Sequence, residues 1–73
     1  MDLVALMGRN IRRLRNAEQL SQEEVAFRAD MKRSYLSELE QGQRNPSVRA
    51  LGRIAAALGV DPRELLTPDR RAK

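Results

Sequence analysis

Residues 22–41 read QEEVAFRADMKRSYLSELEQ, two short helical segments on either side of a turn of three or four residues. Two such helices form a helix-turn-helix when they pack nearly perpendicular to each other. This packing needs a small residue where the second helix presses on the first, and Ala26 stands there; the turn needs a residue that tolerates a positive φ, and Asp30 occupies it. Apolar residues fill the inward-facing positions: Val25, Ala29, Met31, Leu36 and Leu39. The pattern predicts a helix-turn-helix over residues 22–41.

The rest of the chain also has the periodicity and punctuation of helices, with no convincing strand alternation. Ser21 stands three residues before Glu24, a capping-box spacing, and Asp61 followed by Pro62 marks the start of a last short helix. The expected helices span residues 2–17, 22 to 28 or 29, 32–41, 48–58 and 62–66. In the fourth, the apolar face comprises Val48, Leu51, Ile54, Ala55 and Leu58. The predicted fold is all-α, a compact five-helix bundle that contains the helix-turn-helix.

The length and the missing residue types exclude several classes of protein. The 73 residues allow one domain with one small core, expected at residues 1–66, followed by a flexible tail at residues 67–73. The chain has no cysteine and no histidine, which excludes a disulfide framework, a zinc site of the usual kind and a Ser–His–Asp triad. We therefore expect no enzyme, no metal and no cofactor. With so little chain outside the helices, no domain for sensing a small-molecule ligand is expected.

The net charge of +4 is distributed unevenly along the chain. Residues 1–20 carry +2 and residues 42–60 carry +3, whereas residues 21–41 between them carry −2. Basic segments attract nucleic acid, so DNA is the expected partner, contacted electrostatically through the flanks of the helix-turn-helix. The first apolar run, residues 3–7, is too short for a signal peptide or a membrane helix. We expect a cytoplasmic protein, associated with the nucleoid when it binds DNA, and no membrane partner.

Two segments, LSQEEVA at residues 20–26 and RSYLSELEQG at residues 33–42, resemble the Cro/CI-type helix-turn-helix family of phage repressors and bacterial regulators. This family is also described as XRE-like or lambda-repressor-like. The likeness continues through residues 44–47 and 58–61, and it covers roughly residues 6–66. The resemblance implies a lambda-repressor-like DNA-binding domain.

Two positions depart from the family pattern. Asp30 stands where the family prefers glycine, and Lys32 stands where it often has a small capping residue. Within the family, the run RSYLS at residues 33–37 and the overall size are most similar to restriction–modification controller proteins.

The outward face of the third helix carries the residues expected to read DNA bases. An α-helix fits the major groove, where Arg33 can bind guanine in a bidentate fork, and Ser34 and Ser37 are small enough for close approach. Glu38 has two interpretations, as an acceptor for a cytosine amine or as an exposed charge paired with a basic side chain. For Tyr35, packing against the fourth helix and contact with a phosphate are both open. By resemblance, the positions that meet base edges or the adjacent backbone are Lys32, Arg33, Ser34, Tyr35 and Glu38.

Phosphate contacts are expected beside this helix. A helix N-terminus binds phosphate through free amides and its dipole, which indicates the backbone at Ser47 and Val48, together with Arg44 and Asn45. Gln22 resembles a family glutamine that touches phosphate and braces the third helix, although an ordinary helix-start residue is the alternative. The resemblance also implies a buried ion pair, with a structural role, between Arg15 and Glu40.

One such unit contacts too few base pairs to select a site in a genome, so a homodimer on a pseudo-palindromic operator is expected. Candidates for the dimer interface are Val60, Leu65 and Leu66, unless they pack in the core. Leu3 and Leu6 form a second candidate patch, and the sequence does not choose between the two.

These features predict a sequence-specific regulator of transcription that binds double-stranded DNA. It is either a repressor or an activator, for example an autoregulating restriction–modification controller or a phage-type repressor. RNA polymerase is a further partner if it activates. The alternative is an antitoxin-like interaction module that masks a partner protein.

Overall fold

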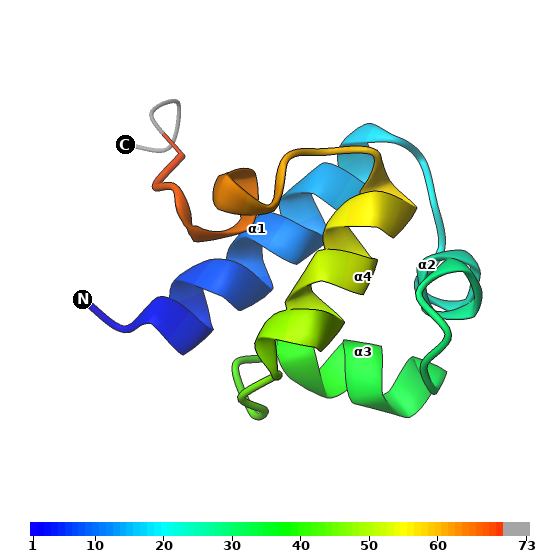
Figure 1. Ribbon diagram of the computed structural model, residues 1–73, viewed down its shortest axis with the longest axis horizontal. Helices are drawn as coiled ribbons and strands as arrows, with labels where there is room; N and C mark the ends of the chain where they lie inside the picture. Colours follow the sequence, from blue (N-terminus) through cyan, green and yellow to red (C-terminus); the bar gives the residue numbers. More distant parts are fainter. Residues whose placement is uncertain (70–73) are drawn as a thin grey trace.

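The computed structural model describes residues 1–69, which form four α-helices and a final 3-10 helix (Figure 1). The elements in chain order are α1 (Leu3–Ala17), α2 (Gln22–Arg28), α3 (Arg33–Glu40), α4 (Val48–Leu58) and η1 (Pro62–Leu66). No strand occurs among these residues, so the all-α prediction is confirmed. The count of five α-helices is not confirmed. The last element has five residues, and its Glu64 N–H bonds to the Asp61 carbonyl three positions earlier, the spacing of a 3-10 helix.

The predicted helix-turn-helix is formed by α2, a turn and α3. Ser21 caps α2, because its Oγ accepts from the N–H of Glu24 at 3.0 Å. In the turn, Asp30 adopts a φ of 57°, the left-handed region that the sequence requires there. Ala26 is buried, and the other inward-facing residues that are also buried are Val25, Ala29, Leu36 and Leu39.

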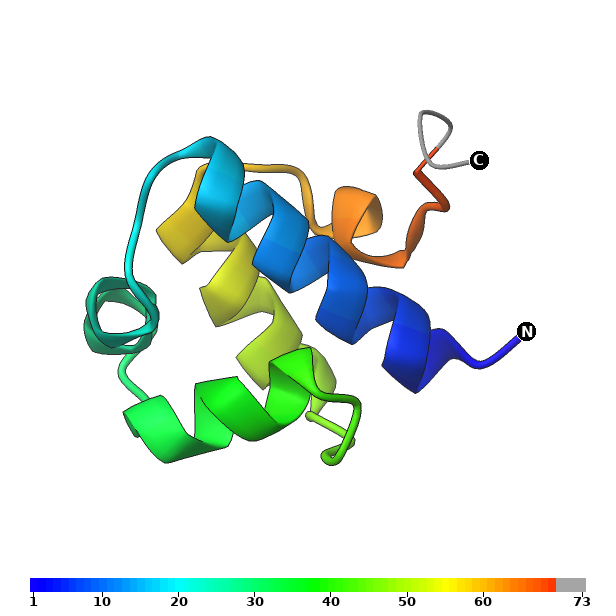
Figure 2. The same cartoon turned by 180° about the vertical axis from the view of Figure 1, so that it is seen from behind.

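A glycine sets the contact between α1 and α3. A Cβ on Gly8 would overlap the carbonyl oxygens of Leu39 and Glu40, so only glycine fits where the two helices cross. Figure 2 shows the result: α3, drawn in green, runs along the lower edge of the molecule with one end beneath α1. The outer side of α3 is left open.

The apolar face expected for α4 is correct except at its start. Ile54, Ala55 and Leu58 are buried and Leu51 is partly buried, but Val48 is 85% exposed. Val48 is the first residue of α4, and the core packs against the later turns of that helix. Its side chain therefore belongs to the surface.

The segment after η1 is tied to α1 by a buried amide. The side-chain nitrogen of Asn10 donates to the carbonyls of Leu65 at 2.9 Å and Thr67 at 3.0 Å. Arg13 forms an ion pair with Asp69 at 3.0 Å. Residues 67–69, the beginning of the expected flexible tail, thus contact α1, while residues 70–73 lie outside the described residues.

Candidate nucleic-acid interface

The open side of α3 displays the basic and small polar residues expected to read bases. Arg33 and Ser34 are exposed and Ser37 is partly buried, since Leu36 and Leu39 turn the opposite side of the helix into the core. No side chain caps α3, because Lys32 occupies the N-cap position and makes no capping hydrogen bond. Lys32 is exposed beside Arg33 at the helix start, where cations face the positive end of the helix dipole.

A shallow hollow gathers several of these residues in front of the helix-turn-helix. It has a volume of about 280 Å³ and is lined by Gln22, Arg33, Ser34 and Ser37. Gln22 comes from α2 and the other three from α3, so the structure brings a predicted phosphate contact beside the predicted base readers. Within residues 1–69, Arg33 has no acidic partner, which leaves its guanidinium available to a ligand.

The predicted ion-pair residues, Arg15 and Glu40, meet in the structure. Arg15 donates two hydrogen bonds to Glu40, from Nε to Oε2 at 2.7 Å and from Nη2 to Oε1 at 3.1 Å. Its Nη1 also donates to the carbonyl of Leu20 at 2.8 Å. Gln22 donates to Glu40 Oε1 at 3.1 Å, so Gln22 braces α3 from α2. The network joins α1, α2 and α3 and fixes the direction in which α3 presents its outer face.

A second ion pair lies at the other end of the outer face. Arg44 Nε donates to Glu38 Oε1 at 2.7 Å, and its guanidinium lies over the Tyr35 ring, 5.9 Å from the centroid. Tyr35 is partly buried and packs against the core. A predicted phosphate contact thus touches two predicted base readers, an arrangement that their sequence spacing does not reveal.

The start of α4 lies next to this cluster. Ser47 is the N-cap of α4, with its Oγ accepting from the N–H of Ala50 at 3.1 Å. Asn45, Ser47 and Val48 are exposed, so the first turn of α4 faces solvent. Free amides there, with Arg44 close by, have the chemistry of a phosphate site.

The three candidates for the dimer interface lie in different environments. Leu65 has no exposed surface and belongs to the core, so a second chain cannot touch it. Val60 is partly buried, whereas Leu66 is 39% exposed. In the second candidate patch, Leu6 is buried and Leu3 is 52% exposed.

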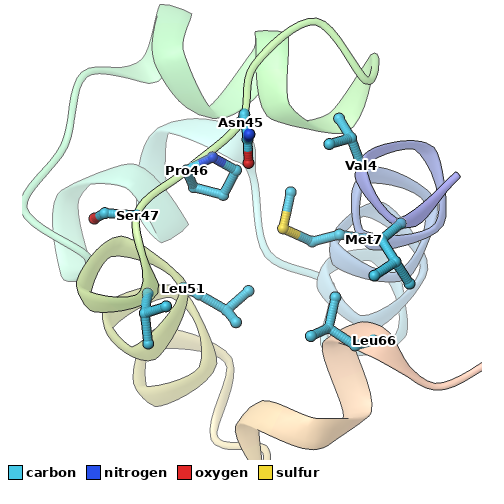
Figure 3. A pocket seen from close by; sticks show the side chains of 9 residues that line it. Val4, Met7, Asn45, Pro46, Ser47, Leu51 and Leu66 are labelled. Atoms are coloured by element: carbon cyan, nitrogen blue, oxygen red, sulfur yellow. The ribbon is translucent and has the colours of Figure 1, made fainter.

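Leu3 and Leu66 line the same apolar groove, shown in Figure 3. The groove has a volume of about 210 Å³ and runs between the start of α1, the start of α4 and η1. Among residues 1–69, no charged residue lines it, although charged residues form 33% of the chain. Its lining consists of Leu3, Val4, Met7, Asn45, Pro46, Ser47, Val48, Leu51 and Leu66. Sequence reasoning missed the contributions of Pro46 and Leu51, which no periodicity links to Leu66.

The described part of the chain has neither a membrane-spanning helix nor a metal-binding cluster. None of its helices has the length and apolarity needed to cross a membrane. In the same residues, no cluster of three or more acidic, histidine or cysteine side chains is placed to hold a metal ion.

Comparison with known proteins agrees with this fold. A family profile described as helix-turn-helix matches residues 11–65. The HTH-type transcriptional regulator y4dJ of Sinorhizobium fredii is 50% identical over 68 residues, which cover 93% of this chain and 88% of that protein. The control protein C.BamHI of Bacillus amyloliquefaciens is 42% identical over 62 residues, or 84% of this chain and 76% of that protein.

A solved structure has the same architecture. The restriction-modification controller protein C.AhdI from Aeromonas hydrophila superposes with a TM-score of 0.83 at 44% identity, covering 85% of this chain and 94% of that one. The chain belongs to the helix-turn-helix family. It is a DNA-binding transcriptional regulator of the XRE type, similar to restriction–modification controller proteins.

Proposed function

We propose that this regulator binds a pseudo-palindromic operator as a homodimer, with α3 of each subunit in the major groove. The observation that carries the proposal is the open face of α3, where Arg33 is exposed and has no acidic partner within residues 1–69. An unpaired guanidinium at the front of an exposed helix suits the O6 and N7 acceptors of guanine. Ser34 and Ser37 allow the helix to approach the bases closely. Lys32 stands at the edge of this face, within reach of a base or the adjacent backbone.

The phosphate contacts are assigned to both sides of α3. On one side, Gln22 is the first residue of α2, and its hydrogen bond to Glu40 orients its side chain. On the other, Arg44, Asn45 and the backbone amides at the start of α4 offer positive charge and free donors. Contacts on both flanks hold α3 in register with the groove while carrying little sequence information themselves.

The apolar groove, with Leu3, Val48 and Leu66 at its exposed edges, is the proposed dimer interface. These are three of the five large apolar side chains that are exposed among residues 1–69, and they come from three different elements. Such a patch without charge is costly to leave in water. Dimerisation through it buries the patch and brings two readout helices onto half-sites about one helical turn apart.

The similarity to control proteins leads us to propose that the chain regulates a promoter through its own concentration, which determines how many operator sites it occupies. A regulator of this kind acts where the DNA is, in the cytoplasm, and needs no catalytic group. If it activates its promoter, RNA polymerase is the second macromolecule that it contacts.

Selection of bound sequences from a random duplex pool, with the oligomeric state measured by sedimentation, tests the proposal. We expect a two-fold symmetric motif, salt-sensitive affinity and a dimer. Leu66→Glu places a charge in the apolar groove and should shift the protein to monomer. The matched control is Phe27→Glu, which changes an equally apolar, 81% exposed residue outside the groove and should leave the dimer intact. An asymmetric motif, or a monomer bound with full affinity, contradicts the proposal.

A further inference from the structure

The loop after α3 delivers Arg44 back onto the helix that it follows. Gly42 has a φ of 73°, its N–H bonds to the Leu39 carbonyl at 3.1 Å, and the Gln43 N–H bonds to the Glu38 carbonyl at 2.9 Å. This pair of bonds is the Schellman motif that closes a helix. The chain therefore reverses at a defined position, and Arg44 lies beside the last turns of α3 by backbone geometry.

The side-chain contact uses only one edge of the Arg44 guanidinium. Glu38 takes the Nε–H, and no other acceptor within residues 1–69 is bonded to Arg44. The four Nη hydrogens therefore remain available as donors. They belong to a side chain that is 56% exposed and that borders the start of α4, where the phosphate contacts are proposed.

We propose that Glu38 acts on DNA through Arg44, as a positioning residue for a phosphate contact and not as a reader of bases. The carboxylate holds the Nε edge while the Tyr35 ring supports the face, and the Nη groups are thereby directed to a DNA phosphate. This inference rests on the proposed DNA contact of Arg44. It assigns a favourable role to a negative charge on a surface that approaches a polyanion.

The physical basis is preorganisation. A free arginine loses side-chain freedom when it binds a phosphate, and an arginine already held in one position loses less. The charge of Glu38 is neutralised by the same contact, so its repulsion of the phosphates is reduced. The sign of the effect separates the alternatives, because removing an ordinary surface carboxylate strengthens DNA binding whereas removing a positioning carboxylate weakens it.

The test compares Glu38→Ala, Arg44→Ala and the double variant on the selected operator and on operators with single base changes, at several salt concentrations. Glu38→Ala should weaken binding about threefold to tenfold on every sequence, the cost of ordering one free arginine side chain. It should lower the salt dependence, and it should have no further effect when Arg44 is already alanine. Glu38→Gln keeps an oxygen acceptor for the Nε–H and should recover much of the affinity.

Glu23→Ala is the matched control, because Glu23 is an exposed carboxylate that lines a second hollow together with Arg33 and has no ion-pair partner within residues 1–69. This variant should bind DNA as well as the parent or more tightly. Unchanged thermal unfolding of all variants would show that folding is unaffected, as expected for an exposed pair.

Four outcomes overturn the inference. Tighter binding by Glu38→Ala on all sequences identifies a simple repulsive charge. A loss confined to one base pair, and retained in the Arg44→Ala background, identifies base readout. Normal binding by Glu38→Ala while Arg44→Ala is impaired rejects the positioning role alone and leaves the proposed function standing, whereas a protein that binds no DNA rejects both.

Discussion

Two arginine–carboxylate ion pairs on α3 have the same shortest distance but different surroundings. Arg15 to Glu40 and Arg44 to Glu38 each join an arginine Nε to a carboxylate oxygen at 2.7 Å. The side chains of the first pair are 12% and 4% exposed, and those of the second are 56% and 39% exposed. The two carboxylates are only two positions apart, so they point to different sides of the helix.

The difference shows that the distance within an ion pair does not reveal its role. The buried pair has lost most of its hydration, so each partner depends on the other, on the bond from Arg15 to the Leu20 carbonyl and on the bond from Gln22 to Glu40. The exposed pair keeps much of its hydration, so it contributes little to the free energy of unfolding. The first pair therefore holds the helices together, and the second is accessible to a ligand.

Breaking the buried pair should have the largest effect. Arg15→Ala leaves the Glu40 carboxylate buried without its cation, which should lower the free energy of unfolding by about 3–5 kcal/mol. Urea unfolding followed by circular dichroism measures it. If that variant does not fold, the double variant Arg15→Met with Glu40→Leu provides the reference, and it should be more stable than Arg15→Ala. If Arg15→Ala lowered the free energy of unfolding by less than about 1 kcal/mol, the range of an exposed pair, the buried pair would not differ from the exposed one.

Within residues 1–69, Arg33 has neither a buried nor an exposed ion-pair partner, so its removal should affect DNA recognition and not folding. Arg33→Ala should lose about 1–3 kcal/mol of discrimination at one base pair of each half-site, because the bidentate contact with guanine is gone. Competition binding with operators changed one position at a time measures the loss. An equal loss of affinity for every operator would show that Arg33 contacts the DNA backbone instead of a base.

Breaking the exposed pair should barely change stability. Arg44→Ala should reduce the free energy of unfolding by no more than about 1 kcal/mol. It should nevertheless weaken DNA binding evenly across sequences and reduce the salt slope by about one. Thermal unfolding measures the change in stability, and DNA binding at several salt concentrations measures the loss of affinity. A stability loss like that of Arg15→Ala would make the two pairs equivalent.

A third pair, Asp61 with Arg63, should have the smallest effect, seen only in acid. The hydrogen bond from the Arg63 side chain and that from its backbone N–H lower the pKa of Asp61 from 3.8 to about 2. Because the folded pKa lies below the unfolded one, the contribution of Asp61 is present above pH 4 and is lost as the pH falls toward 2. Asp61→Asn should remove this pH dependence, measured as the urea midpoint across that range. An unchanged acid response would show that other carboxylates dominate it.

The helices could be predicted because their signals are local. The spacing of apolar residues, the caps at Ser21 and Asp61 and the turn at Asp30 act over a few residues. The exposed face of α3 followed from the burial of Leu36 and Leu39 on the opposite side. Periodicity was less informative at the ends of elements, where Val48 proved exposed because the core does not extend to the first turn of α4.

Two adjacent leucines show where sequence reasoning stops. Leu65 and Leu66 have the same side chain, yet the first is buried and the second lines the apolar groove. Their orientation is set by η1 and by the bonds of Asn10 to the carbonyls of Leu65 and Thr67, residues more than fifty positions away. No local pattern contains this information.

The amino-acid order alone therefore specified a helical DNA-binding unit and the exposed face of its third helix, because caps, turns and amphipathic spacing are each contained within a single segment. The packing of the segments decided which charges are paired, which leucine is exposed and where Arg44 lies. Those features depend on distances between segments, and the cost of burying a charge or an apolar side chain is known only once the neighbours are in place.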